Sequence, residues 1–294
     1  MRRLGPVVLF ALAVLAPLSV MATGPCARDA LDSEVCLAGP AERVVSLSPG
    51  ATELLFSAGA GAKVVAVSAW SDFPAEAAEL PRVGNSNRLD LEAIVSLAPD
   101  LVVAWIDGNS RSQLERVSDL GIPVFWLAPR AFEDIARAVE NLAALTGEPA
   151  LGKTRAESFR EGIASIESRY VDARPVRVFY QIWDQPLMTV NREELISKAI
   201  EVCGGVNVFG HLPRLVPRIS REAVLAANPD AIVTAGQTGN LQWLEDWQQF
   251  PGLTAVAAGN LFLEPPDLLA RPTLRIVEGA RHLCQTLEQA RANL

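Results

Sequence analysis

The feature that most constrains the fold of this chain is an internal repeat. The stretch LEAIVSLAPDLVVA, which begins at Leu91, returns 130 positions later as REAVLAANPDAIVTA, which begins at Arg221. In each copy an acidic residue opens a short helix, Pro-Asp turns the chain, and a β-branched run follows as a buried strand. A repeat at this distance predicts two similar halves.

Each half alternates strands with helices. We expect strands at residues 43–47, 64–68, 101–105 and 123–127 in the first half, and at 177–182, 231–235 and 260–263 in the second. Buried β-branched runs separated by helical patterns are typical of parallel sheets covered by helices. Right-handed crossovers then put a ligand site at the carboxyl ends of the strands.

A long helical pattern lies between the halves. Apolar residues recur at helical spacing over residues 132–145 and again from about 150 to 170. A helix of that length spans about 30 Å, the diameter of a small lobe. The predicted fold is therefore α/β, with two Rossmann-like lobes of parallel sheet joined by a single long α-helix and a ligand cleft between them. The stiffness of the helix favours limited hinge motion. The predicted segments are a leader (1–22), a lead-in (23–42), an N-terminal lobe (43–146), a linking helix (147–174) and a C-terminal lobe (175–294).

The first 22 residues have the pattern of a secretory signal peptide. Arg2 and Arg3 precede an uncharged stretch that ends in Val20-Met21-Ala22, where a cleavage site is expected. The alternative is a transmembrane anchor, but Pro6 and Pro17 interrupt the stretch. Removal of the leader leaves 24 basic and 34 acidic residues and a net charge of −10. The mature protein is expected to be soluble, exported to the periplasm and not inserted in a membrane, and its acidity argues against nucleic-acid binding.

Export makes the four cysteines potential disulfide partners. Cys26 and Cys36 are ten residues apart and are able to close a small surface loop, whereas a bridge between Cys203 and Cys284 would staple the C-terminal half. Three pairings are possible from the sequence, and four free thiols are the alternative.

Sequence motifs of enzymes are absent. The chain has no Gly-Lys-Ser/Thr phosphate loop and no Gly-x-Ser-x-Gly nucleophile elbow. The two histidines, His211 and His282, have no metal-ligand spacing. We therefore expect a protein that is not an enzyme and has no metal site or cofactor.

Three tryptophans indicate a ligand site. Trp70, Trp105 and Trp183 each stand at or just after the carboxyl end of a predicted strand. Large flat rings at that edge suit a bulky, mostly apolar, planar ligand, although a tryptophan taken alone is more often ordinary core. In the loop of residues 267–272, Arg271 is a candidate to hold an amide oxygen or a phosphate of the ligand, and a solvated salt bridge is the alternative.

The sequence resembles the cobalamin-binding periplasmic proteins that feed vitamin import ATPases, from about Arg43 to Leu287. The stretches that carry the resemblance are Leu47-Ser48-Pro49 with Thr52-Glu53-Leu54, Ser71-Asp72, Leu91-Glu92, Pro99-Asp100-Leu101-Val102, Ala104-Trp105 with Gly108-Asn109, Glu201-Val202-Cys203-Gly204-Gly205 and Ser220-Arg221-Glu222. Haem and iron–siderophore binders share the same two-lobe, helix-linked fold.

The resemblance implies roles for individual residues. Trp70 stands where the family carries a tyrosine that contacts the corrin, and Trp105 matches a pocket tryptophan. The loop Asp267, Leu268, Leu269, Ala270 and Arg271 matches one that contacts cobalamin. Cys203 and Cys284 match a structural disulfide of the family.

Two acidic residues are implied to dock on the transporter. Glu92 and Glu222 match the acids that meet arginines of the membrane permease, one in each lobe, and equivalent carboxylates on two similar lobes suit a symmetric partner. As residues at helix N-termini they also interact favourably with the helix dipole.

The predicted function is capture of cobalamin or another corrinoid by a monomeric exported protein and its delivery to the permease dimer of an ABC importer. The same-fold alternative is a haem carrier, for which only His211, Tyr170 and Tyr180 are candidate ligands, or a ferric-siderophore carrier, which would rely chiefly on Arg271. The alternative from another class is an exported α/β enzyme.

Overall fold

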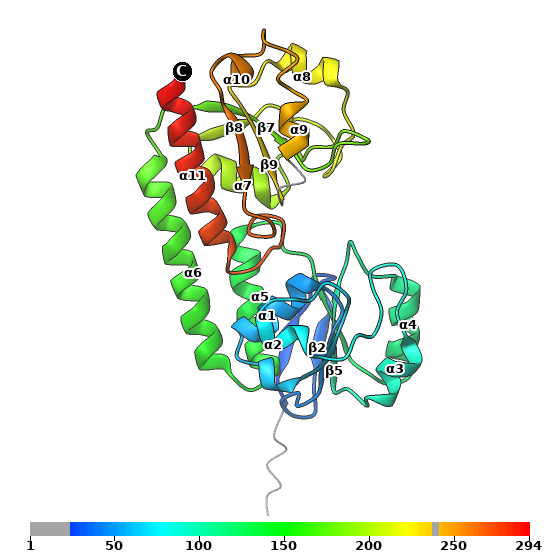
Figure 1. Ribbon diagram of the computed structural model, residues 1–294. Coiled ribbons are helices and arrows are strands. Elements are labelled where there is room, and N and C mark those ends of the chain that lie inside the picture. Colours follow the sequence, from blue (N-terminus) through cyan, green and yellow to red (C-terminus); the bar gives the residue numbers. More distant parts are fainter. Residues whose placement is uncertain (1–23, 237–240) are drawn as a thin grey trace, which may run out of the picture.

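The computed structural model describes residues 24–236 and 241–294, which form two α/β lobes joined by helices (Figure 1). The predicted leader, residues 1–22, lies outside the described residues. Within the described part of the chain, no helix combines the length and apolarity needed to cross a membrane.

The N-terminal lobe is built on a four-stranded parallel sheet with the order β4-β3-β5-β6. Its strands are β3 (Val44–Ser46), β4 (Val64–Val67), β5 (Leu101–Trp105) and β6 (Val124–Leu127). Each boundary lies within one residue of the predicted one. Around the sheet run α1 (Pro49–Ser57), η1 (Gly61–Lys63), α2 (Ala75–Ala78), α3 (Leu91–Ser96), α4 (Arg111–Asp119) and α5 (Phe132–Leu145).

The C-terminal lobe repeats this topology. Its strands β7 (Val176–Gln181), β8 (Gly205–Asn207), β9 (Ala231–Ala235) and β10 (Leu261–Glu264) form a parallel sheet with the order β10-β9-β7-β8. The helices of this lobe are α7 (Leu195–Val202), α8 (Arg221–Ala227), α9 (Leu241–Glu245) and α10 (Thr254–Ala257). In both lobes the second strand of the chain is at one edge, followed by the first, third and fourth, so the predicted two-lobe α/β fold is confirmed. Strand β8 was not predicted from the sequence, because it is only three residues long.

The repeat also preserves a side-chain contact that fixes each first strand. Asp100 accepts hydrogen bonds through Oδ2 from the backbone N–H groups of Glu42 and Arg43, and Arg43 donates through its guanidinium to the carbonyl of Leu97. In the second lobe Asp230 accepts from the N–H of Arg177, whose guanidinium donates to the carbonyl of Ala227. The Pro-Asp turn therefore ties each repeated helix to the start of its central strand, which explains why the Asp recurs.

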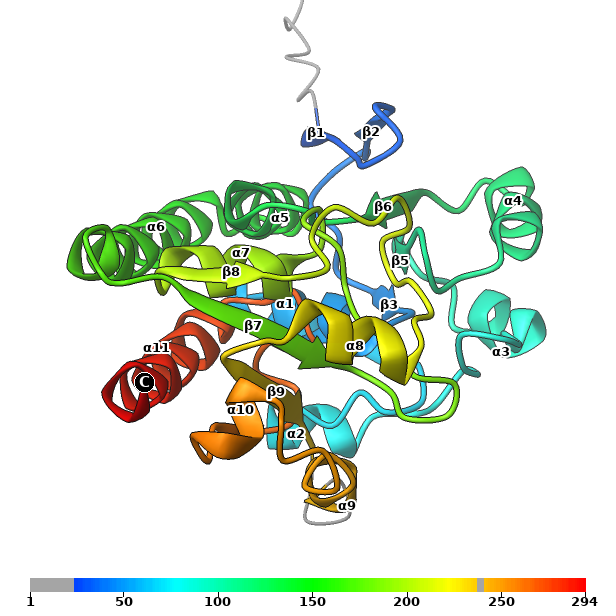
Figure 2. The ribbon, with the colours of Figure 1, turned by 90° about the horizontal axis from the view of Figure 1, so that it is seen from above.

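The lobes are joined by α6 (Pro149–Tyr170), with α11 (Ile276–Asn293) beside it (Figure 1). Gly147 has a φ of +85°, which suits glycine and lets the chain reverse between α5 and α6. A Cβ on Gly162 of α6 would lie 3.0 Å from Val277 of α11, so the glycine permits close approach of the two helices. Figure 2 shows α5, α6 and α11 together on one side of the molecule, away from α3 and α4.

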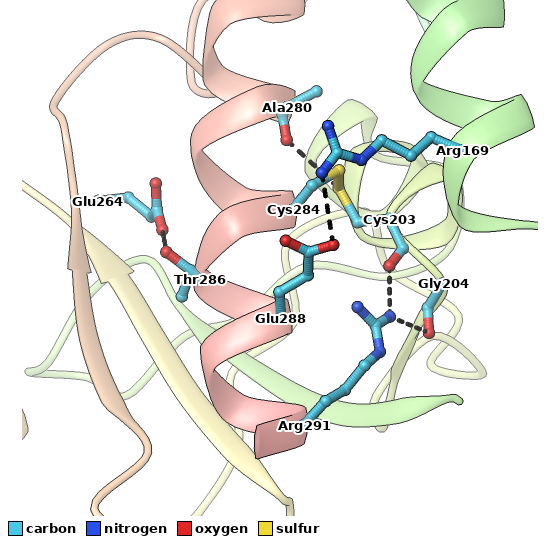
Figure 3. Close-up of a disulfide and its surroundings, with 9 residues drawn as sticks. All are labelled: Arg169, Cys203, Gly204, Glu264, Ala280, Cys284, Thr286, Glu288 and Arg291. Carbon is cyan, nitrogen blue, oxygen red and sulfur yellow. Dashed lines mark hydrogen bonds and ion pairs between the residues drawn. A yellow bond between two sulfur atoms is a disulfide. The ribbon is translucent and has the colours of Figure 1, made fainter. Parts of the chain in front are cut away.

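A disulfide between Cys203 and Cys284 fixes α11 to the end of α7, and both cysteines are buried (Figure 3). Arg291, about two helical turns further along α11 on the same face, donates to the carbonyls of Cys203 and Gly204 and to that of Arg174. The final helix is therefore attached to the C-terminal lobe covalently and by hydrogen bonds.

The lead-in forms a short antiparallel hairpin of β1 (Cys26–Arg28) and β2 (Glu34–Cys36), closed by a disulfide between Cys26 and Cys36. The N–H of Ala30 donates to the carbonyl of Trp126 on β6, at a distance of 2.9 Å. Because β6 is the edge strand of its sheet, the hairpin covers part of an edge that would otherwise be open to pairing.

Candidate functional site

The carboxyl ends of the two sheets face each other. Arg271, which follows β10 of the C-terminal lobe, contacts Glu53 on α1 and Asp72 after β4, both in the N-terminal lobe. Glu194, just before α7 of the C-terminal lobe, has its pKa raised by burial, and the positive charge of Arg130, after β6 of the N-terminal lobe, acts to lower it. Residues from the ends of both sheets therefore meet at one interface between the lobes.

Glu53 is the centre of an ion-pair network at this interface. Its Oε1 accepts from Arg271 Nη1 at 2.9 Å and from Arg275 Nη1 at 3.2 Å, and its Oε2 accepts from Thr273 Oγ1 at 3.0 Å. The Glu53 side chain is only 2% exposed. A carboxylate this deeply buried is tolerable because two guanidinium groups and a hydroxyl replace its water.

Arg271 bridges three carboxylates and has little freedom. Besides Glu53 it contacts Asp72 at 2.7 Å and Asp267 at 3.2 Å, and its side chain is 13% exposed. Burial disfavours its charge, but hydrogen bonds to Asp72 and Glu53 outweigh that effect and raise the pKa of Arg271. The hydrogen bond from Arg271 likewise lowers the pKa of Asp72. The sequence left two roles open for Arg271, a ligand contact or a solvated salt bridge. In the structure Arg271 forms salt bridges, and they are largely buried.

Trp70 extends into solvent after β4. Its side chain is 79% exposed and its backbone has a φ of +66°, a conformation that costs a non-glycine residue about 1–3 kcal/mol. The next residue, Ser71, is buried and accepts a hydrogen bond from Thr52 of α1. The chain is thus anchored directly beside the indole, while the indole itself is left uncovered.

Trp105 occupies the end of β5 and is partly buried. Its backbone N–H donates to the side-chain oxygen of Asn109, and the side-chain amide of Asn109 donates to the carbonyl of Leu47 after β3. A Cβ on Gly50 would lie 3.8 Å from the Trp105 ring and 3.7 Å from Pro272. Trp105 and the loop after β10 therefore approach the same residue of α1 from opposite lobes.

Trp183 lies two residues beyond β7 and is 54% exposed. Its indole N–H donates to the carbonyl of Gln185, and its ring meets Trp243 edge to face with centroids 5.9 Å apart. This pairing orients the ring while one surface remains open.

The loop that follows β10 is divided between surface and interior. Asp267, at a φ of +68°, and Ala270 are accessible, whereas Leu268 and Leu269 are buried. Gly279 of α11 allows this packing, because a Cβ there would lie 2.9 Å from Leu269 and 3.0 Å from Leu268. The two leucines hold the loop in place, and its exposed surface comes from Asp267 and Ala270.

Glu92 and Glu222 are equivalent in structure as well as in sequence. Each is exposed in the first turn of its short helix, after the capping residues Asp90 and Ser220. Hydrogen bonds from its own N–H and from Ser220 lower the pKa of Glu222. An exposed aliphatic residue stands three positions after each acid, Val95 in one lobe and Leu225 in the other. Each lobe thus presents an acid beside an apolar side chain, which we name the two acidic patches.

Sequence reasoning gave no role to Glu53, Thr273 or Arg275. A signal existed, because Glu53 is the single charged residue in the otherwise uncharged helix α1. A lone carboxylate in such a helix requires a partner if that face is buried. The partners themselves lie 218 to 222 residues away and were not evident from local pattern.

Within residues 24–236 and 241–294, no cluster of three or more His, Cys, Asp or Glu side chains is placed to hold a metal ion. His211 and His282 are both exposed. Tyr170 and Tyr180 are buried. The candidate site consists of the aromatic rings of Trp70, Trp105 and Trp183 and the ion-pair network around Glu53.

A family model and individual relatives both match most of this chain. Residues 44–268 match the family described as periplasmic binding protein. The vitamin B12-binding protein of Vibrio parahaemolyticus is 34% identical over 253 residues, which cover 86% of this chain and 91% of that protein.

Solved structures agree with this similarity. The periplasmic vitamin B12-binding protein BtuF of Vibrio cholerae superposes with a TM-score of 0.80 at 34% identity, over 86% of this chain and 98% of its own. The periplasmic heme-binding protein RhuT from Roseiflexus has a TM-score of 0.75 at 23% identity, over 85% and 98% of the two chains. The second similarity extends to the fold alone.

Proposed function

The chain belongs to the periplasmic binding protein family, which it matches over residues 44–268, and on this premise we propose that it captures cobalamin or a related corrinoid outside the cytoplasmic membrane and delivers it to an ABC importer. The observation that carries the proposal is the 34% identity with vitamin B12-binding proteins, which extends over most of both chains. No bond is made or broken in this function.

The ligand would lie between the facing ends of the two sheets. Trp70 and Trp183 contribute exposed indoles from opposite lobes, and Trp105 contributes a partly buried ring at the end of β5. Exposed aromatic rings are commonly found at sites that bury them on binding. A corrin ring is large, flat and mostly apolar, so it is suited to cover these indoles, and the strained backbone of Trp70 is consistent with a site arranged in advance.

The residues at this site are less suited to haem or ferric siderophores, the ligands of the two same-fold alternatives. A haem carrier would need an axial ligand, but Tyr170 and Tyr180 are buried and His211 stands in an exposed loop. A ferric catecholate siderophore is an anionic complex that calls for free cations, whereas Arg271 is already engaged by Glu53, Asp72 and Asp267. In this proposal Arg271 and the loop of residues 267–271 shape the floor between the lobes.

The two acidic patches are the proposed docking surfaces for the permease. Glu92 and Glu222 would pair with cations on two copies of a symmetric membrane partner, with Val95 and Leu225 packing beside them. The protein would act as a soluble periplasmic monomer after its leader is removed. The helices α6 and α11 and the network around Glu53 favour a small change of lobe orientation on binding.

Calorimetric titration of the mature protein with cyanocobalamin, haemin and the anionic siderophore complex ferric enterobactin tests the ligand assignment. We expect saturable binding of one cyanocobalamin per chain and no comparable binding of the other two. Binding of haemin or ferric enterobactin without binding of cyanocobalamin would replace the corrinoid assignment with one of the two alternatives.

A further inference from the structure

A separate hollow is lined by residues of the N-terminal lobe and of the two long helices α6 and α11. It has a volume of about 460 Å³. None of Trp70, Trp105 and Trp183 lines it. Its walls come from α1, the turn before α2, α6 and the start of α11, and the residues that matter here are Phe56, Phe73, Arg155, Leu274, Arg275, Val277, Glu278 and Arg281.

Three arginines surround this hollow. Arg155 on α6 and Arg281 on α11 are exposed, and neither makes an ion pair or hydrogen bond with any residue that the structure describes. Arg275 donates to Glu53, whose charge is already shared with Arg271. The one other acid in the wall is Glu278, which also lacks a partner in the described chain. The whole chain has more acidic than basic residues, 34 against 26. The lining of this hollow has the opposite excess, with three arginines and two glutamates.

The remaining wall is aromatic and aliphatic. Phe73 is 43% exposed, and the guanidinium carbon of Arg275 lies 3.9 Å from the centroid of its ring. Phe56, Leu274 and Val277 are partly buried hydrophobics that pack on the core and also line the hollow. The site therefore offers flat apolar surface directly beside positive charge.

We propose that this hollow binds a small organic anion with a flat apolar body. The phosphate, sulfonate or carboxylate of the ligand would lie between Arg155, Arg275 and Arg281, because guanidinium groups donate paired hydrogen bonds that match such oxygens. The body of the ligand would cover Phe56 and Phe73. Glu278 repels a second anionic group on that side, so a ligand with charge at one end only is preferred.

The site does not depend on the proposed capture of corrinoids. Its structural links to the interface between the lobes are Glu53, which also lines the hollow, and Arg275, which contacts Phe73 in the hollow and Glu53 in the ion-pair network. Since none of the exposed indoles contributes to it, occupation of this hollow and occupation of the indole site are separable by experiment.

The probe for the test is 1-naphthyl phosphate, with 1-naphthol as its uncharged counterpart. Titration of the mature protein would be followed by calorimetry and by methyl NMR, with the resonances of Leu274 and Val277 as reporters. We expect saturable binding with shifts at both methyl groups, and affinity at least about tenfold weaker for 1-naphthol. Raising the sodium chloride concentration should weaken phosphate binding, because exposed charges are screened.

The decisive variant is Arg155→Gln/Arg281→Gln, which removes two side chains without described partners and should leave the melting temperature unchanged. We expect it to weaken binding of the phosphate by about tenfold or more. The matched control is Arg116→Gln/Lys153→Gln, with the same loss of charge. Lys153 is on α6 two residues from Arg155, so it points to another side of the helix. Equal affinities for the two double variants, shifts at the Trp70 or Trp183 indole N–H groups with none at Val277, or no binding of the phosphate by the unaltered protein would each overturn the proposal.

Discussion

Arg271 and Glu53 form an ion pair that joins the two lobes, with 2.9 Å between Nη1 and Oε1. The residues are 218 positions apart in the chain. Sequence considerations made Arg271 a candidate to hold the ligand, but its guanidinium is taken up by three carboxylates. The pair therefore links the loop after β10 to α1 and sets the relation between the two strand ends that face each other.

Loss of Glu53 should destabilise the protein strongly. In Glu53→Gln, Arg271 and Arg275 lose the charge that compensates their burial, and we expect the free energy of unfolding to fall by about 3–5 kcal/mol. Urea denaturation would measure it. The control Glu92→Gln changes an exposed acid and should shift the free energy by less than about 0.5 kcal/mol. Equal stability of the two variants would show that the network around Glu53 contributes little.

The exposed indoles should contribute to ligand binding and little to stability. We expect Trp70→Ala and Trp183→Ala each to weaken cyanocobalamin binding by tenfold or more, since loss of a large apolar contact costs about 1.5–3 kcal/mol. Calorimetric titration would measure the affinities. Leu120→Ala is the control, because Leu120 is also exposed but follows α4, away from the strand ends. Unchanged affinity in both tryptophan variants would exclude these rings from the site.

The two disulfides should differ in their contribution to stability. The bridge between Cys203 and Cys284 closes a separation of 81 residues, and that between Cys26 and Cys36 closes one of 10. Loop-closure entropy gives about 4–5 kcal/mol for the first and about 3 kcal/mol for the second. We expect Cys203→Ala/Cys284→Ala to lower the thermal midpoint more than Cys26→Ala/Cys36→Ala in calorimetric melting. The reverse order would mean that the hairpin cover of β6 is the more important attachment.

Glu264 should make stability depend on pH. Burial raises its pKa, against a hydrogen bond from Thr286 and the nearby His282, which lower it. The folded protein then binds this proton more tightly than the unfolded chain, so the contribution to stability is present below the ordinary glutamate pKa and is lost as pH rises through the folded value. Glu264→Gln keeps an oxygen to accept from Thr286 but removes the charge. We expect the variant to be more stable than the unaltered protein at pH 8, with the difference shrinking toward pH 4. A difference in thermal midpoint that is constant over that range would contradict the assignment.

The acidic patches should affect delivery and leave capture unchanged. Charge reversal in Glu92→Lys/Glu222→Lys is expected to abolish ligand-stimulated ATP hydrolysis by the cognate importer in proteoliposomes, because cations on the partner would meet cations. Cyanocobalamin affinity should stay within about twofold of the unaltered protein. Loss of ligand binding in this variant would mean that the two acids support the lobes themselves.

The sequence was most informative about the repeated elements. Strand β5 is a fully apolar run after a Pro-Asp turn, and β9 is apolar except for Thr234. Burial on both sheet faces favours such near-continuous apolar runs. The short strand β8 and the hairpin of β1 and β2 were missed, because three residues carry too little periodicity.

The candidate site was predicted only in part, because some of its features follow from local sequence order and others from long-range packing between the lobes. Placement of Trp70, Trp105 and Trp183 at the strand ends follows from local order along the chain. The partners of Arg271 depend on how two lobes meet, which no local pattern records. The burial of Leu268 and Leu269 depends on the missing side chain at Gly279 of α11. Long-range packing of this kind becomes visible only once both lobes are assembled.

The most direct measurement of the central claim is a crystal structure with cyanocobalamin, in which anomalous scattering at the cobalt edge locates the metal of the ligand. The proposed function predicts a single cobalt peak between the facing strand ends, with the corrin in contact with Trp70 and Trp183. A cobalt peak elsewhere on the protein, or none in crystals soaked at saturating ligand, would contradict it.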